Sequence, residues 1–317
     1  YTQSYSCEIK KPFWETWWFR LVALLVIVFL INLLYKLRLR QVQRQKKILE
    51  EQVRERTIDL EKANKEIQAQ RDLAENQRDQ ITIQKKEITD SIQYAERIQR
   101  SLLPSATRVQ EDLADYFVLF KPRDIVSGDF YWTTDLDQFL ILVAADCTGH
   151  GVPGAFMSML GISFLNEIVN KNRVHESDQI LNMLRGHIIE ALQQKGGIGE
   201  AKDGMDIAIC VINKETNTLQ FSGANNPLYF IRNGMIEHIK GDKMPVAIHV
   251  KMQPFQKHEI KLQKNDTFYL FSDGFADQFG GPDGGKFKYK PFRELLLENH
   301  EKPMEEQRQV LDRTFEE

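Results

Sequence analysis

The chain has 317 residues, 42% of them hydrophobic and 27% charged, which is enough for one large folded domain with accessory segments. Its net charge of −3, from 42 basic and 45 acidic residues, argues against a dedicated nucleic-acid-binding protein, so we expect no nucleic-acid partner. Cys7, Cys147 and Cys210 lie far apart without a CxxC pair, which argues against a disulfide framework or a cysteine zinc site.

Residues 17–35 are almost wholly apolar and predict a transmembrane helix, because a helix of this length spans roughly 28 Å, close to the thickness of a bilayer core. Trp17 and Trp18 stand at one end, as aromatic residues do at a membrane interface. The basic residues of segment 36–47 follow the span and orient the C-terminal part toward the cytoplasm. We therefore expect a single-pass protein of the bacterial inner membrane. A buried core helix is the less favoured alternative.

The first residues, YTQSYSCEIKKPFWE, resemble the last strand of a domain that begins earlier in the chain. We expect residues 1–16 to be the end of a truncated extracytoplasmic sensor domain.

A seven-residue repeat of mainly apolar positions runs from Leu39 to Leu102 and predicts a coiled coil over residues 36–103 that pairs two copies of the chain. The companion positions of the repeat include three glutamines that weaken the seam: Gln70, Gln77 and Gln84. The sequence leaves two interpretations open, a stable dimerisation rod and a marginal rod that switches between packings when a sensor moves. Pro104 should end the helix.

Residues 104–317 are predicted to form a separate globular domain, because short β-like runs alternate there with turn residues and amphipathic helical stretches. The expected strands cover residues 117–120, 139–145, 206–212, 219–222, 228–231, 259–262 and 268–271. The expected helices cover residues 154–170 and 178–194. The Asn233-Gly234 step indicates a type I′ hairpin and hence an antiparallel sheet. The pattern favours an α+β fold with two sheets covered by helices.

Three aspartates stand at the ends of apolar, strand-like segments, each with a glycine within three residues: Asp129, Asp146 and Asp273. Glycine turns at strand ends allow carboxylates to converge, and carboxylate oxygens are the ligands that Mg²⁺ and Mn²⁺ prefer. A single Ser-Asp-Gly step is usually only a turn. Three acidic steps in one domain favour a metal cluster.

Four motifs in this order carry a specific resemblance: SGDFYW, AADCTGHGVPGAFMSMLG, FSGANNPLYF and FSDGFADQFGG. Together they resemble the SpoIIE-like branch of the PPM (type 2C) serine/threonine protein phosphatases, over roughly Ile98 to the C-terminus. SIQYAERIQRSLLP resembles the linker helix that enters those domains, and PFWETWWF resembles the end of a periplasmic Y_Y_Y module attached to β-propeller sensors. The resemblance implies a PPM-type α-β-β-α sandwich of two mainly antiparallel sheets covered by helices.

The resemblance also implies a catalytic centre with two divalent cations, Mn²⁺ or Mg²⁺. Asp146 would bridge the two ions, Cys147 would offer its backbone carbonyl, and Asp129 and Asp273 would be further ligands. Such a metal pair makes a bound water acidic enough to attack phosphorus, so no protein nucleophile is needed. The implied substrate is phosphoserine or phosphothreonine on a cytoplasmic partner protein, which in the family is often an anti-sigma-factor antagonist.

Five further residues are weaker candidates. Arg123 could position the phosphate, although a solvated charge is the more common role for such a residue. His150 could donate a proton to the leaving oxygen, and a helix-entry role is equally favoured. Asp203 and Asp206 could reach a third metal ion, and Asp277 could support the site, but each also fits a solvated turn.

One feature departs from the family, because its members end with a strand that bears another metal-binding aspartate. Asp312 stands in a helical pattern instead, so we expect that the last strand follows Glu317 and that the metal site within these 317 residues is incomplete. The main prediction is a membrane-anchored, metal-dependent phosphatase, and the alternative is a catalytically inactive phosphatase-like sensor or binding module. A histidine kinase is disfavoured because the coil contains no histidine, and a nucleotide cyclase because a GGDEF-like signature is missing.

Overall fold

The structure is a computed structural model that describes residues 12–104, 115–197, 202–281 and 284–317. It divides into two compact units, Tyr1–Gln84 and Lys85–Glu317, which are treated separately here. The expected sensor-domain end lies mostly outside the described residues, as does Cys7.

The helix α1, Trp17–Leu102, dominates the first unit and continues into the second. A short 3₁₀ turn, Phe13–Glu15, precedes it, and the helix ends just before Pro104, as predicted. Among the described residues, two helices are apolar and long enough to cross a membrane: α1, whose apolar window is fully exposed, and Gly151–Lys171, whose window is half buried. The second of these packs in a protein core, which leaves the apolar part of α1 as the candidate span within the described part of the chain.

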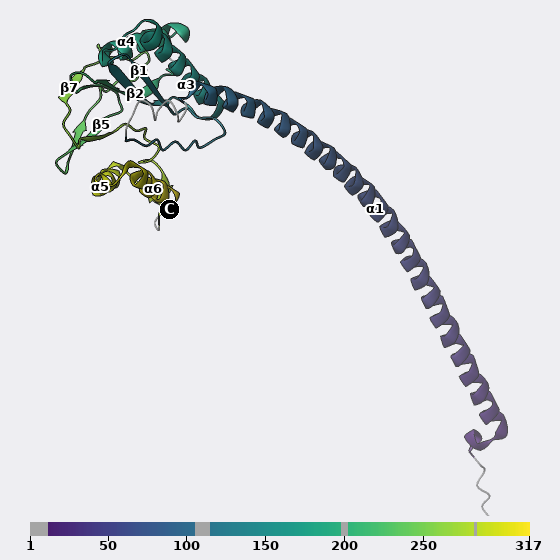
Figure 1. The fold of residues 1–317 in the computed structure, drawn as a ribbon. Coiled ribbons are helices and arrows are strands. Elements are labelled where there is room, and N and C mark those ends of the chain that lie inside the picture. Colours follow the sequence, from purple (N-terminus) through teal and green to yellow (C-terminus); the bar gives the residue numbers. More distant parts are fainter. Residues whose placement is uncertain (1–11, 105–114, 198–201, 282–283) are drawn as a thin grey trace, which may run out of the picture. The chain divides into compact units, whose positions relative to one another are not determined.

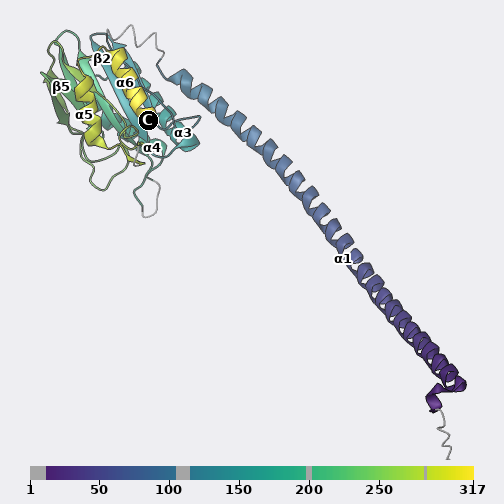
Figure 2. The ribbon, with the colours of Figure 1, turned by 90° about the horizontal axis from the view of Figure 1, so that it is seen from below.

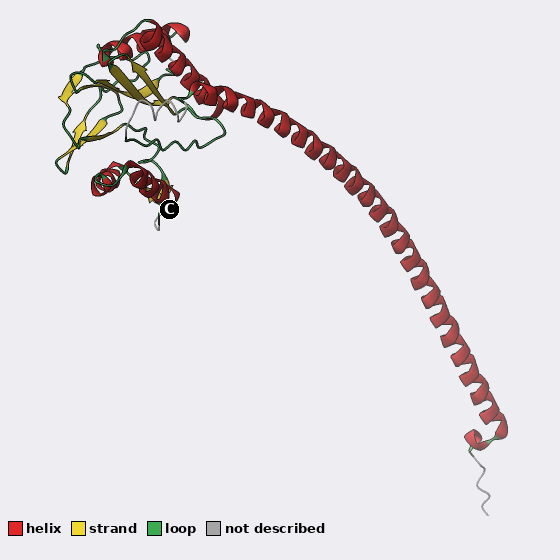
Figure 3. Ribbon diagram, in the orientation of Figure 1, coloured by secondary structure: helices red, strands yellow, loops and turns green. Residues whose placement is uncertain are grey.

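The second unit contains a five-stranded antiparallel sheet with the strand order β1-β2-β3-β4-β7, called sheet A below (Figures 1 and 3). Its strands are β1 Phe130–Leu136, β2 Phe139–Cys147, β3 Met205–Asn213, β4 Thr218–Ala224 and β7 His258–Lys261. Alternate residues of each strand point to opposite faces. One face packs on helices, and the other contributes to a smaller apolar cluster with residues of the second sheet.

The second sheet has the order β6-β5-β8, with β5 Leu228–Arg232, β6 Met235–Ile239 and β8 Thr267–Tyr269. Asn233 and Gly234 both have positive φ, 52° and 70°, which is the geometry of a type I′ turn and confirms the predicted hairpin. A two-stranded ribbon of β9, Phe279–Gly280, and β10, Gly285–Lys286, follows.

Helices form the two outer layers of this unit (Figures 1 and 2). The helix α3, Gly151–Leu165, continues as a π-helical turn, Asn166–Lys171, and packs with α4, Ser177–Ala191, on sheet A. The helices α5, Tyr289–Asn299, and α6, Met304–Glu316, pack against the second sheet. Two antiparallel sheets between helical layers confirm the predicted α+β sandwich.

Two predictions of local structure were incomplete or wrong. Residues 117–120 do not form a strand; Phe117 and Leu119 instead pack by their side chains on the apolar cluster of α5 and α6. Strand β1 was not predicted, because Thr133, Thr134 and Asp135 interrupt its apolar pattern, although it pairs with β2 along its whole length. Strand pairing is decided by tertiary neighbours, which a local pattern does not reveal.

Candidate metal centre

Three carboxylates lie side by side at one end of sheet A. Asp146 is the penultimate residue of β2, and its register partner on β3 is Asp206. Asp129 directly precedes β1, whose first residue pairs with Ala145, so the antiparallel register places Asp129 opposite Asp146. Paired residues point to the same face of a sheet. These side chains therefore share the face that is turned away from α3 and α4.

Asp273 joins this group from the segment that follows β8. The carboxyl of Asp146 shares hydrogen bonds with those of Asp129 and Asp273. The Ser272 hydroxyl, next to Asp273, donates a hydrogen bond of 2.6 Å to Oδ2 of Asp129. The three aspartates predicted as metal ligands are thus brought together from segments far apart in sequence.

Electrostatic repulsion within the group shifts its protonation. Burial, followed by the charges of Asp129 and Asp273, raises the pKa of Asp146 to about 8. Burial of its carboxyl and the charges of Asp277 and Asp129 also raise the pKa of Asp273, although this residue as a whole is exposed. Like charges in one site oppose ionisation. In the absence of a cation the group therefore favours retention of a proton.

Asp206 belongs to the same cluster. Burial raises its pKa, the Asp273 charge acts in the same direction, and a hydrogen bond from Asn225 opposes the shift. The amide Nδ2 of Asn225 donates to Oδ1 of Asp206 at 2.8 Å. Asn225 has a φ of 56° in the turn after β4, so the Asn-Asn turn holds a carboxylate of the cluster through its side chain.

Close backbone packing fixes the turns that carry Asp129 and Asp146. A Cβ atom on Gly128 would lie 2.8 Å from the Gly149 carbonyl oxygen, and one on Gly154 would lie 2.5 Å from the same oxygen. The loops before β3 and after β2 are also joined, because Thr148 N donates to the Gly204 oxygen at 2.9 Å and Gly204 N donates to the Thr148 hydroxyl at 3.2 Å. The sequence requires glycine where these backbones meet.

The weaker candidates lie around the cluster. Asp277 pairs with Lys286, whose Nζ lies 2.8 Å from its Oδ2, and Asp277 contributes to the raised pKa of Asp273. The backbone carbonyl of Asp203 accepts a hydrogen bond from Gln194, which fixes the loop before β3. The exposed His150 begins α3, with its Nδ1 3.4 Å from Oδ2 of Asp124. Arg123 is exposed.

The donor set fits hard divalent cations. Carboxylates supply every side-chain ligand atom in the group, and oxygen is the donor that Mg²⁺ and Mn²⁺ prefer. The Cys147 thiol is buried on the helical face of sheet A, and burial raises its pKa, so this side chain is unsuited to the site. Within the described residues, no three His, Cys, Asp or Glu side chains are already converged on one metal position.

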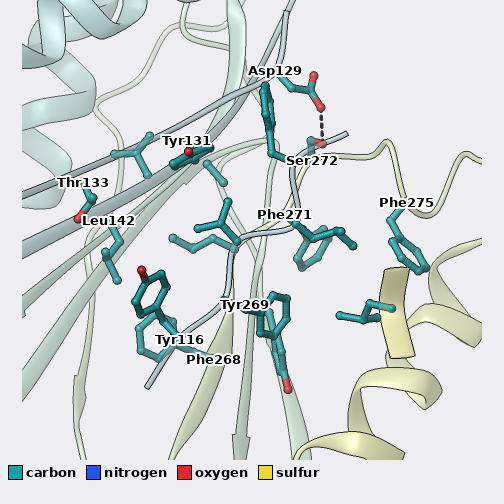
Figure 4. Close-up of a pocket in the computed structure, with 18 of the residues that line it drawn as sticks. Tyr116, Asp129, Tyr131, Thr133, Leu142, Phe268, Tyr269, Phe271, Ser272 and Phe275 are labelled. Carbon is teal, nitrogen blue, oxygen red and sulfur yellow. Dashed lines mark hydrogen bonds between the residues drawn. The ribbon is translucent and has the colours of Figure 1, made fainter. Parts of the chain in front are cut away.

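A cavity of about 400 Å³ lies behind the cluster, between the two sheets and the helices α5 and α6. Figure 4 shows Asp129 and Ser272 at one end of it, joined by their hydrogen bond, with aromatic side chains such as Tyr131, Tyr269 and Phe271 farther inside. This lining is too apolar to bind phosphate. The apolar part of the cavity therefore lies inside the domain behind the carboxylates, and the carboxylates form its polar end.

Sequence reasoning gave no role to three residues of the site. Ser272 stands inside the quoted Ser-Asp-Gly motif and was overlooked as a partner of Asp129. Burial and the charges of Asp273 and Asp277 raise the pKa of Tyr289 to about 12, so its hydroxyl lies near these carboxylates. Asn225 stands in the quoted FSGANNPLYF motif, and its hydrogen bond to Asp206 was not predicted. No local signal pairs these residues with their partners, because each pairing is tertiary.

Comparisons with known proteins agree with this fold. The model of the stage II sporulation protein E (SpoIIE) family matches residues 137–317. Phosphoserine phosphatase RsbU of Bacillus subtilis (strain 168) is 26% identical over 223 residues, which are 68% of this chain and 61% of that relative. The solved SiaA-PP2C domain of Pseudomonas aeruginosa has a TM-score of 0.65 and 30% identity over 73% of this chain and 90% of that one. The chain therefore belongs to the SpoIIE family of PP2C-type (PPM) serine/threonine protein phosphatases.

Proposed function

We propose that this protein is a membrane-anchored phosphatase that hydrolyses phosphoserine or phosphothreonine on a cytoplasmic partner protein. The observation that carries the proposal is the cluster of Asp129, Asp146, Asp206 and Asp273 at the end of sheet A, with Asp146 hydrogen-bonded to two of the others. Carboxylates gathered in this way repel one another unless cations bind between them. Cations bound there would also stabilise the negative charge of a phosphoryl group during its transfer.

Asp129, Asp146 and Asp273, with the backbone carbonyl of Cys147, would hold two divalent cations, Mn²⁺ or Mg²⁺. When bound, such ions supply positive charge to the phosphate and an acidified water as the nucleophile. The residues of the chain supply geometry, because Ser272 orients the Asp129 carboxylate by a hydrogen bond. The exposed His150 would give a proton to the leaving oxygen, and the exposed Arg123 would help to position the phosphate.

The apolar part of α1 would anchor the protein in the bacterial inner membrane, with the phosphatase domain, residues 104–317, in the cytoplasm. The continuation of α1 to Leu102 is exposed over most of its length, and the segment 36–103 would pair with a second copy as a coiled coil. The substrate is a phosphoprotein, and the similarity to a phosphoserine phosphatase supports phosphoserine as the group that is hydrolysed. An anti-sigma-factor antagonist is the substrate class that the family resemblance implies. The chain covers 61% of that relative, so its partners are assigned here by proposal.

A catalytically inactive, phosphatase-like binding module is the second candidate. It is favoured by the lack of a converged group of three ligand side chains among the described residues. Asp312 does not add to the cluster, because it lies in α6 and pairs with Lys121. In this case the domain would bind its partner protein without turnover.

Mn²⁺-dependent release of phosphate from a phosphoserine protein tests the proposal on the full chain. Asp146→Ala and Asp273→Ala should each lower the rate by roughly a hundredfold or more, because each loses charge stabilisation of several kcal/mol. Asp178→Ala, on α4 and away from the cluster, is the matched control and should keep the wild-type rate. Equal rates in all proteins would refute the catalytic role, and partner binding without turnover would favour the second candidate.

A further inference from the structure

Gln99 is unlike the other residues of α1. It is 4% exposed, and it is the one residue of this helix that the structure describes as buried. It lies near the end of α1, in the unit Lys85–Glu317, where the helix meets the phosphatase domain. Burial of a polar side chain is unfavourable unless its hydrogen-bonding groups are satisfied, so the partners of Gln99 are informative.

The carboxamide of Gln99 pairs with the backbone of Ser127 in both directions. Its Nε2 donates to the Ser127 carbonyl at 2.6 Å, and its Oε1 accepts from Ser127 N at 3.1 Å. The same Nε2 donates to the hydroxyl of Ser158, on α3, at 2.7 Å. Ser127 and Ser158 are themselves buried. An amide has both a donor and an acceptor, which this pairing requires.

The segment held by Gln99 leads directly to the metal cluster. Ser127 is separated from Asp129 by Gly128 alone, and a Cβ on Gly128 would lie 2.8 Å from the Gly149 oxygen. The backbone therefore has little room to shift on that side. On the other side its position depends on Gln99, because β1 begins only at Phe130.

We propose that Gln99 is a positioning residue that places the Asp129 carboxylate for metal binding. This inference rests on the proposed function, in which Asp129 is a ligand. Gln99 supplies to Ser127 the pair of hydrogen bonds that a neighbouring strand would otherwise give. The end of α1, the middle of α3 and the Asp129 segment then form one hydrogen-bonded group. Its loss would leave Asp129 free to turn away from Asp146.

Titration of the full chain with Mn²⁺ in detergent, followed by isothermal calorimetry, tests the inference without use of catalysis. Gln99→Glu keeps the shape of the side chain but replaces its donor with an acceptor, so the contact with the Ser127 carbonyl becomes repulsive. We expect Mn²⁺ affinity to fall about tenfold or more. Gln93→Glu makes the same chemical change at an exposed position of α1 and should bind as the wild type does.

Ser158→Ala is the second variant. It removes one partner of Gln99 and leaves the pairing with Ser127, so a smaller loss of affinity is expected. Far-UV circular dichroism and the melting temperature of each metal-free variant separate misfolding from misplacement. The inference about Gln99 would be overturned if the folded Gln99→Glu variant bound Mn²⁺ with wild-type affinity, or if Gln93→Glu lost as much Mn²⁺ affinity as Gln99→Glu. Neither result would affect the proposed metal site. If Asp129→Ala, or the wild type itself, showed no metal dependence, the proposed metal site would fail and the inference with it.

Discussion

The packing of α3 on the turns of the metal cluster predicts opposite effects for two glycine-to-alanine changes. Gly154 lies in the first turns of α3, where a Cβ would meet the Gly149 oxygen at 2.5 Å and the Gly128 Cα at 3.0 Å. Gly186 lies in α4, and a Cβ there would meet nothing within 4 Å. Both changes raise helix propensity. The difference between their effects on the free energy of unfolding therefore reports the cost of packing the new methyl group.

Alanine in place of glycine inside a helix increases the free energy of unfolding by about 1 kcal/mol. Gly186→Ala should show this gain. At Gly154 the new methyl group meets backbone on two sides, and such overpacking costs about 3 kcal/mol, which leaves a net loss of about 2 kcal/mol. For a domain of this size each kcal/mol moves the melting temperature by about 2–4 °C. We therefore expect a decrease of about 4–8 °C for Gly154→Ala and an increase of about 2–4 °C for Gly186→Ala.

Chemical denaturation followed by tryptophan fluorescence measures the difference, because Trp132 is 3% exposed in the core that contains α3. Gly154→Ala should also bind Mn²⁺ more weakly, since relief of the clash displaces the turns that follow Asp146 and precede Asp129. If Gly154→Ala were as stable as Gly186→Ala, α3 would not be packed tightly on these turns. The argument for a rigid support of the cluster would then be refuted.

Two other changes test the cluster and the coiled coil. Asp206→Asn should raise the melting temperature of the metal-free protein, because a charge opposite Asp146 is lost. The same change should weaken Mn²⁺ binding about tenfold, as measured by calorimetry. Unchanged affinity would exclude Asp206 from the metal site. Replacement of Gln70, Gln77 and Gln84 by leucine should tighten association of the full chain in sedimentation experiments and blunt its response to a signal. Unchanged association would show that the polar seam is incidental.

The sequence allowed the three clustered aspartates to be selected more readily than the sheet edges. Asp129, Asp146 and Asp273 each stand at the end of an apolar run with a glycine within three residues, which is a local pattern. Asp206 was ranked lower, because its place opposite Asp146 depends on the pairing of β2 with β3 across a long intervening segment. The role of Gln99 was not predicted, because its hydrogen-bond partners come from distant segments of the chain. A glutamine on a helix with a heptad pattern is normally expected to be solvated.

Sheet A explains why the carboxylates can be held close together despite their repulsion. Their strands are paired continuously with one another, and alternate residues on the opposite face, such as Phe130, Ala145 and Ile207, are buried against α3 and α4. The energy of this core fixes the strand ends, so the carboxylates cannot separate to relieve their charge. A bound cation would relieve the repulsion between the carboxylates, which makes cation binding more favourable. A ligand that binds the native state stabilises the native state, and tighter binding gives greater stabilisation. If cations bind at the carboxylates as proposed, stability of the domain and cation binding are linked through β1, β2 and β3.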